Sequence, residues 1–170
     1  KCLAVARLQS RLADAFWQHI AIIPRVCKQI RRGKRLHPVV HLHVFNSRGD
    51  IYLQKRPAWK DIQPGKWDTA VGGHVDLGES VEMALRREAA EELGLTDIAP
   101  ERLPHYVFES ARERELVFPH RCTFDGDIRP SAETDGGRFW SIDELRENIG
   151  QGVFTPNFES EFRRLFGQLL

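Results

Sequence analysis

The segment from residue 73 to residue 95 places acidic side chains where a helix needs apolar ones. On a helical wheel of about 100° per residue, the apolar stripe is formed by Val81, Ala84, Leu85 and Ala89. Glu88 and Glu92 fall in the middle of that stripe, and Glu91 lies at its border. A helix over residues 80–93 therefore turns two carboxylates toward the body of the protein.

Inward carboxylates need a compensating cation. Burying an unpaired carboxylate costs several kcal/mol, and like charges four residues apart on a helix also repel each other. Arg87 can serve one of these acids, and Glu79 is a suitable partner for it. A cluster of several carboxylates is better matched by a hard divalent metal, and Mg²⁺ usually also binds substrate phosphates. The pattern predicts a metal site for phosphate chemistry.

The rest of the chain alternates strands with helices. Strands are predicted at residues 39–45, 51–54, 67–71, 103–109, 115–124 and 138–140, the first two forming a hairpin. The helix over 80–93 ends at Gly94, a second opens at the capping box Ser141-x-x-Glu144, and a third begins at Thr155-Pro156. Helices inserted between strands predict an α/β fold with a mixed sheet and helices on both sides.

Charge divides the chain into two parts. Residues 1–36 hold nine Lys/Arg and one acid, Asp14, and are interpreted as an amphipathic helix ended by Pro24 and a basic linker. Packing on the body, an organelle transit segment and nucleic-acid contact all stay open for this segment. Residues 37–170 are acidic overall, which argues against nucleic-acid binding by the body. The chain shows no apolar run long enough to span a membrane.

The run Gly73-x5-Glu79-x7-Arg87-Glu88-Ala89-x-Glu91-Glu92-x-Gly94-Leu95 resembles the Nudix box. Only Ala89 departs from the usual pattern, because the family more often has a larger aliphatic residue there. The similarity extends from about His37 to the C-terminus. It implies an α/β Nudix-type α/β/α sandwich with a mixed sheet over residues 37–170, preceded by the basic segment 1–36.

The resemblance also implies roles for individual residues. Glu88, Glu91 and Glu92 would bind one to three Mg²⁺ or Mn²⁺ ions, with a backbone carbonyl at Gly73 as a further ligand. The structural positions of the box would be Gly73, Glu79, Arg87 and Gly94, with Glu79 and Arg87 forming a buried pair. The reaction would be attack of water on a phosphorus atom of a small-molecule diphosphate.

A carboxylate would act as the general base in that reaction. Glu88 is one candidate, and Glu113 and Glu115 are the others, because they share one face of a predicted strand. Glu115 is the favoured base, since it adjoins an apolar run and is expected to lie deeper. Neighbouring carboxylates are expected to raise its pKa when no metal is bound.

One branch of the same fold, type I isopentenyl diphosphate isomerase, is also similar to this sequence. His37, the pair Gly73-His74 and Glu113-x-Glu115 resemble metal-binding residues of that branch. Gly72, however, stands where the isomerase needs its catalytic cysteine. The sequence is therefore interpreted as a hydrolase of the isomerase-like branch, with an isomerase or a non-catalytic nucleotide-binding module as alternatives.

Several further features remain open. His41 and His43 are interpreted as sheet residues, whereas His37 and His74 are candidates for an extra metal or phosphate contact. Basic residues of the loop before the box, Lys55 and Lys66 among them, are candidates for binding an outer phosphate. Nucleoside diphosphates, nucleotide sugars, dinucleotides and prenyl diphosphates all fit the box. An odd number of cysteines favours a reducing, cytoplasmic setting, with an organelle as the alternative, and a homodimer is a further expectation.

Overall fold

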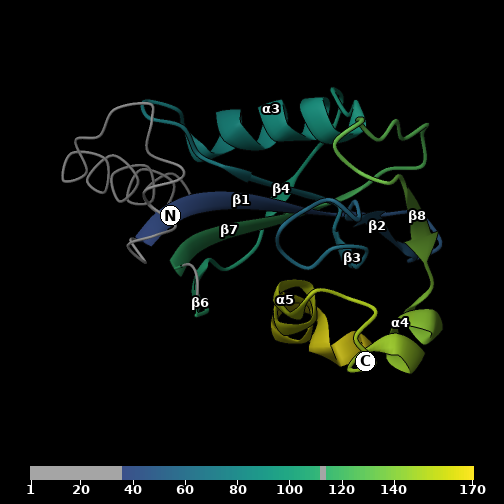
Figure 1. Ribbon diagram of the computed structural model, residues 1–170. Coiled ribbons are helices and arrows are strands. Elements are labelled where there is room, and N and C mark those ends of the chain that lie inside the picture. Colours follow the sequence, from purple (N-terminus) through teal and green to yellow (C-terminus); the bar gives the residue numbers. More distant parts are fainter. Residues whose placement is uncertain (1–35, 112–113) are drawn as a thin grey trace.

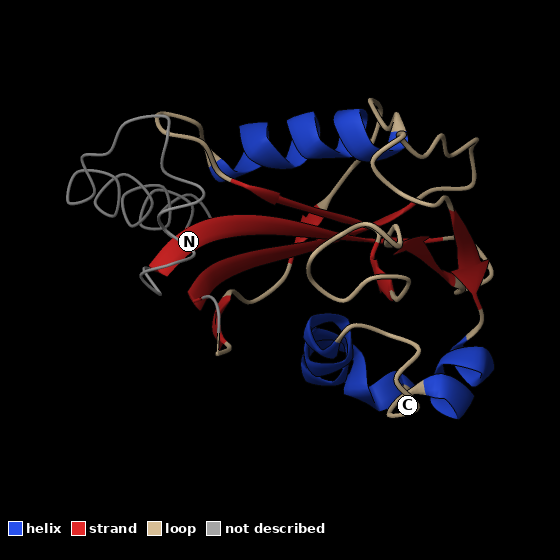
Figure 2. Cartoon of the chain, in the orientation of Figure 1, coloured by secondary structure: helices blue, strands red, loops and turns tan. Residues whose placement is uncertain are grey.

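The computed structural model describes residues 36–111 and 114–170. A mixed β-sheet lies between two helical layers (Figure 1, Figure 2). Helix α3 (Val81–Leu93) covers one face, and α4 (Ile142–Asn148) and α5 (Pro156–Phe166) cover the other, followed by the short 3-10 helix η1 (Gly167–Leu169). The predicted α/β fold with a mixed sheet is confirmed, whereas the predictions for residues 1–35 lie outside the described residues.

Strand β1 is the centre of the sheet. The strands are β1 (Leu36–Phe45), β2 (Ile51–Lys55), β3 (Trp67–Thr69), β4 (Val71–His74), β5 (Glu101–Arg102), β6 (Tyr106–Glu109), β7 (Arg114–Thr123) and β8 (Gly137–Trp140). Along one side β1 runs parallel to β7, and along the other it pairs antiparallel with β2 and then with β4. The remaining pairs are antiparallel, with β3 and β8 flanking β2 and with β5 and β6 both on β7.

Two predicted strands differ in the structure, one being divided and the other shortened. The strand expected over 67–71 is β3 and β4, which separate at Ala70 because β3 pairs with β2 whereas β4 pairs with β1. The strand expected over 103–109 begins only at Tyr106, as β6, and a separate short strand, β5, precedes it at Glu101–Arg102. The break between them contains Pro104, which lacks the N–H that a ladder requires.

The alternation of β1 gives the two faces of the sheet different character. Val40, Leu42 and Val44 enter the core beneath α3, together with the buried face of that helix. The second core lies on the α5 side, where Phe158, Phe162 and Phe166 pack with Ile51, Leu53 and Trp140. Because side chains alternate along a strand, the histidines of β1, His37, His41 and His43, point toward the α5 side.

Candidate active site

Both ends of α3 are fixed by local hydrogen bonds. The Ser80 side chain accepts from the Met83 N–H at 3.2 Å, which caps the first turn. At the other end Gly94 adopts a left-handed conformation with φ of 68°, which suits glycine. The preceding loop is closed by Glu79, whose carboxylate accepts from the Asp76 N–H at 3.1 Å. Glu79 is thereby turned back toward the helix.

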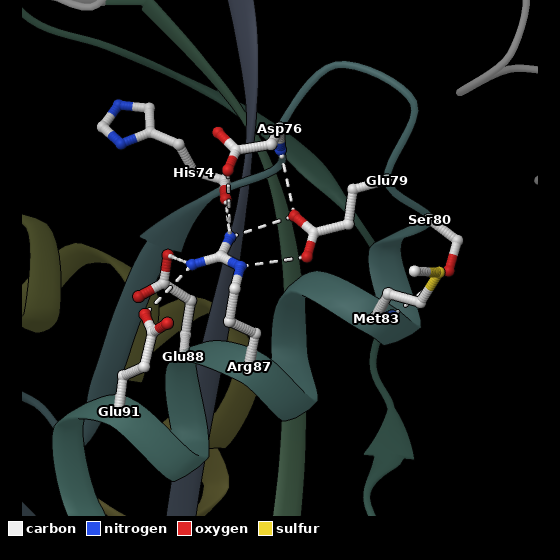
Figure 3. A network of polar contacts seen from close by, with 8 residues as sticks. All are labelled: His74, Asp76, Glu79, Ser80, Met83, Arg87, Glu88 and Glu91. Carbon is white, nitrogen blue, oxygen red and sulfur yellow. Dashed lines mark hydrogen bonds and ion pairs between the residues drawn. The ribbon is translucent and has the colours of Figure 1, made fainter.

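Arg87 is the hub of the polar contacts at this site (Figure 3). Its Nε and Nη2 atoms donate to the two carboxylate oxygens of Glu79, both at 3.0 Å, so the predicted pair between these residues is present. Its Nη1 atom donates to Glu88 at 2.7 Å and to Glu91 at 3.3 Å. The Arg87 hydrogen bonds, together with one from the Asp76 backbone, lower the pKa of Glu79 against the effect of burial. One guanidinium therefore hydrogen-bonds three carboxylates and lies 3.9 Å from a fourth, that of Asp76.

Glu88 packs against the backbone of β4. A Cβ built at Gly73 would overlap the Glu88 carboxylate, so this position accepts only glycine while Glu88 keeps its place. The Glu88 side chain is largely buried, with 14% of its surface exposed. Burial raises the pKa of Glu88, and the like charges of Glu91 and Glu79 add to this, although Arg87 opposes both. The helical wheel correctly predicted that this carboxylate points inward.

Glu92 has neutral partners only. Its Oε2 atom accepts from the Gly72 N–H and from the Gln54 amide, each at 3.2 Å. Burial raises the pKa of Glu92 to about 7, and the charge of Glu88 adds to the effect. The Gln54 contact was missed from the sequence, although the alternation of β2 places Gln54 on the same side as the buried Tyr52. Glu91, by contrast, has an exposed side chain.

The backbone of β4 presents polar groups at the open edge of the strand. Val75 N–H donates to Pro38 O at 3.1 Å, which makes this a hydrogen-bonded pair of the antiparallel ladder. Such pairs alternate with pairs whose N–H and C=O groups point outward. Gly73 therefore bonds to β1, whereas Gly72 and His74 point outward, and His74 O accepts from Arg87 at 3.0 Å. The outward carbonyl beside Glu92 belongs to Gly72, so Gly72 is a better candidate ligand than Gly73.

Glu115 lies on the other face of the sheet from Glu88. Leu116 and Phe118 pack in the core beneath α3, so the alternation of β7 turns Glu115 to the α5 side. There it lies 3.7 Å from the His37 Nε2 atom, and the His37 ring stacks on that of His74 at 5.1 Å. The expectation that Glu115 faces the box carboxylates is wrong, because the parallel pairing of β1 with β7 sets its face. Glu113 lies outside the described residues.

The expected rise in the pKa of Glu115 is also wrong. Burial does push this pKa upward, but the neighbouring imidazoles of His37, His41 and His74 together lower it. Histidines, and not carboxylates, are its close neighbours. A catalytic role for Glu115 stays a prediction, in an environment that differs from the one expected.

A buried acid that sequence reasoning missed lies between β1 and α5. The Glu161 side chain is fully buried, 2.7 Å from His41 Nδ1 and 3.5 Å from His43 Nε2. Burial pushes the pKa of Glu161 upward, but the charges and hydrogen bonds of the two histidines outweigh it and lower the pKa. Burial would likewise lower the pKa of His41, yet Glu161 raises it to about 9. His41 and His43 are sheet residues, as interpreted, and His41 also neutralises this acid.

The basic residues before the box are spread over the loop and its flanks. Lys55 ends β2, and alternation turns it away from the side that Gln54 and Glu92 share. Lys66 is partly exposed at the end of the loop. Arg56 contacts Asp68 at 3.1 Å, and Lys60 lies 3.9 Å from Glu133. Phosphate binding by Lys55 or Lys66 stays a prediction.

A model of the NUDIX domain family matches residues 35–158. The chain belongs to the Nudix family. It is 36% identical over 138 residues to a Yersinia pestis protein named as an uncharacterized Nudix hydrolase, covering 80% of this chain and 75% of that one. It is 33% identical over 129 residues to an isopentenyl-diphosphate Delta-isomerase of Leifsonia xyli, covering 71% and 69%. The crystal structure of DR0079 from Deinococcus radiodurans superposes with a TM-score of 0.72 at 26% identity, covering 85% and 90%.

The acidic residues of this Nudix chain suit a divalent cation. Glu88 and Glu92 have raised pKa values, and the oxygen atoms at the β4 edge are the hard donors that Mg²⁺ prefers. Across residues 36–111 and 114–170, no three His, Cys, Asp or Glu side chains are already gathered as metal ligands. At the box, Arg87 draws Glu88 and Glu91 to itself. No helix in the described residues is long and apolar enough to cross a membrane.

Proposed function

We propose that this Nudix protein hydrolyses a diphosphate bond of a small organic substrate in the presence of Mg²⁺ or Mn²⁺. The observation that carries the proposal is the shortage of positive charge around Glu88 and Glu92, both largely buried, both with raised pKa values. Arg87 is shared among four carboxylates, so an added divalent ion and its phosphate ligand would complete the charge balance.

Glu88, Glu91, Glu92 and the outward carbonyl of Gly72 would hold the metal. When bound, the metal activates water and neutralises charge on the diphosphate. Glu88 and Glu91 must then leave Arg87, which stays fixed on Glu79 through two hydrogen bonds. The bidentate pair keeps the loop in place while the two glutamates turn.

Glu88 is the favoured general base. Its carboxylate lies against Gly73 on the side of the sheet that carries the other box acids, whereas Glu115 lies on the opposite face. The raised pKa of Glu88 suits a group that accepts a proton from water. Glu92, held by the Gly72 N–H, is better placed as a ligand.

The direct experiment is a screen of organic diphosphates with Mg²⁺, reading released phosphate or phosphomonoester. At least one compound is expected to be cleaved, and excess chelator should abolish the cleavage. Metal-dependent binding without cleavage of any compound would instead favour a non-catalytic nucleotide-binding module. Undiminished cleavage in chelator would contradict the metal assignment.

The isomerase is the second candidate, because one relative carries that name. Its proton transfer would need an acid–base group at residue 72, where this chain has glycine. Cys122 does not replace it, since it is buried in the core beneath α3. Isopentenyl diphosphate in deuterated water is expected to gain no carbon-bound deuterium, and measurable exchange would reverse this ranking.

A further inference from the structure

One ring nitrogen of His41 is committed and the other is available. Nδ1 lies 2.7 Å from the fully buried carboxylate of Glu161, so it donates to that oxygen. Nε2 has no hydrogen-bond partner within the described part of the chain. Unlike the Nε2 atoms of His37 and His43, it is not one of the buried atoms. The His41 side chain keeps 14% of its surface exposed, so Nε2 is within reach of a ligand.

Gly72 leaves the ring of His41 uncovered. A Cβ at residue 72 would stand 3.4 Å from Cδ2 and 3.6 Å from Nε2 of His41, so a longer side chain would lie over the ring. The backbone of Gly72 also donates to Glu92 on the edge proposed to hold the metal. His41 is therefore separated from the proposed diphosphate site by a single residue of β4. Gly72 is thus the residue that adjoins both the proposed metal edge and the His41 ring.

Three of the elements packed around His41 bring a charged group to it. The charges nearest to it come from Glu161 on α5, Glu115 on β7 and Asp68 on β3. His43 adjoins the same Glu161, and so does Tyr106 of β6, which lies under the guanidinium of Arg164. Against such groups a hydrocarbon chain would remove water from charges without replacing its hydrogen bonds. A group bearing hydroxyls can both donate to the carboxylates and accept from an imidazole.

We propose that His41 is a specificity residue that hydrogen-bonds a hydroxyl-bearing organic group of the substrate through Nε2, and that Glu161 is the positioning residue that orients it. The inference rests on the proposed function, since the ligand is the organic part of the same diphosphate. It assigns sugar-bearing diphosphates, and not prenyl diphosphates, to the face opposite α3.

Equilibrium binding tests this contact independently of turnover. ADP-ribose is the hydroxyl-bearing probe and inorganic pyrophosphate the minimal one, each titrated by calorimetry with Ca²⁺ in place of Mg²⁺. Glu161→Gln and His41→Gln should each weaken the binding of ADP-ribose by about tenfold, which corresponds to the loss of one hydrogen bond to a charged group. Pyrophosphate affinity should stay within about twofold. His120→Gln is the matched control, because it removes a buried histidine of the same sheet on the α3 side.

The outcomes separate the two proposals. Equal loss of ADP-ribose and pyrophosphate in His41→Gln, or no loss of either, overturns the contact whether or not the protein hydrolyses anything. Tighter binding of isopentenyl diphosphate than of ADP-ribose by the unaltered protein also overturns it. Selective loss of ADP-ribose affinity in a protein without turnover supports the contact and rejects the hydrolase.

If Glu161→Gln does not fold, the binding data for His41→Gln alone decide. Where substrate is turned over, KM should rise in His41→Gln while kcat stays within about threefold.

Discussion

The two sides of β1 each bury carboxylates, and they balance the charge in different ways. On the α3 side Glu92 has only neutral partners, and its pKa is raised to about 7. On the α5 side Glu161 is more deeply buried, yet its pKa is lowered because His41 and His43 surround it. Burial is common to both sides, so burial does not set the direction of the shift. The direction follows from whether the protein supplies the opposite charge itself.

This difference distinguishes a binding site from a self-contained cluster. A carboxylate that already has an imidazolium partner gains little from an added cation, and removing that partner leaves an uncompensated buried charge. A carboxylate without such partners is held in a state that an added cation relieves. The α3 side is thus the side on which we expect a metal, and the α5 side is expected to orient His41 without one.

The largest effect is expected from removing the metal or a ligand on the α3 side. Glu92→Gln should lower turnover by roughly 10²–10⁴-fold, the order of general-base and metal-ligand contributions, and should leave the fold intact because it relieves repulsion. Steady-state kinetics and circular dichroism measure both. Glu82→Gln is the matched control on the same helix, since Glu82 is exposed and its ion pair in the described residues is with Arg86. Equal losses in the two variants would remove Glu92 from the site.

On the α5 side the expected effect is on stability. Glu161→Gln removes the charge that compensates His41, and breaking a buried pair costs about 3 kcal/mol. Urea unfolding measures the change. Glu159→Gln, two residues away on α5, loses the ion pair with Arg163, whose side chain is half exposed, but keeps an amide oxygen that can accept from the Gly150 N–H, and it should cost less than about 1 kcal/mol. If both variants were equally stable, the Glu161 cluster would not contribute as a compensated pair.

The choice of base separates the two faces kinetically. Glu88→Gln should cut turnover by about 10²-fold, and Glu115→Gln should cut it less, because Glu115 is on the α5 side. Single-turnover rates at saturating substrate compare the two variants directly. A larger loss in Glu115→Gln would restore the sequence-based choice and would show that the reacting water lies on the histidine side.

The smallest expected effect is a pH dependence of metal binding. Glu92 has a pKa raised to about 7 in the metal-free fold, so it still holds a proton at pH 6 and has lost it at pH 8. Metal competes with that proton, and affinity for Mn²⁺ should therefore rise about tenfold between these values. The folded metal-free protein binds this proton more tightly than the unfolded chain does. Its free energy of unfolding should therefore fall as pH rises from about 4.5 to about 7. Glu91→Gln should keep both trends, whereas Glu92→Gln should lose them.

Local patterns predicted α3 well, because the position of a residue on a helical wheel depends only on spacing. The same reasoning would have found Glu161, which follows Phe158 by three residues and precedes Phe162 on the buried face of α5. The face of Glu115 was not predictable in this way. It depends on the parallel register of β1 with β7, which joins residues about 78 apart in the chain, as in His37 with Glu115. Gln54 reaches Glu92 only because β4, β1 and β2 are brought together by the fold.

The two neighbouring glycines of β4 differ in how freely they can vary during evolution. At Gly73 a side chain would displace the Glu88 carboxylate, so every replacement there puts the chemistry of the α3 side at risk. At Gly72 a Cβ makes only ordinary contact with the His41 ring, so small residues fit. A lineage can therefore sample new side chains at residue 72 without losing the carboxylates one position away. This pair of positions allows ligand preference to diversify while the machinery for diphosphates is inherited unchanged.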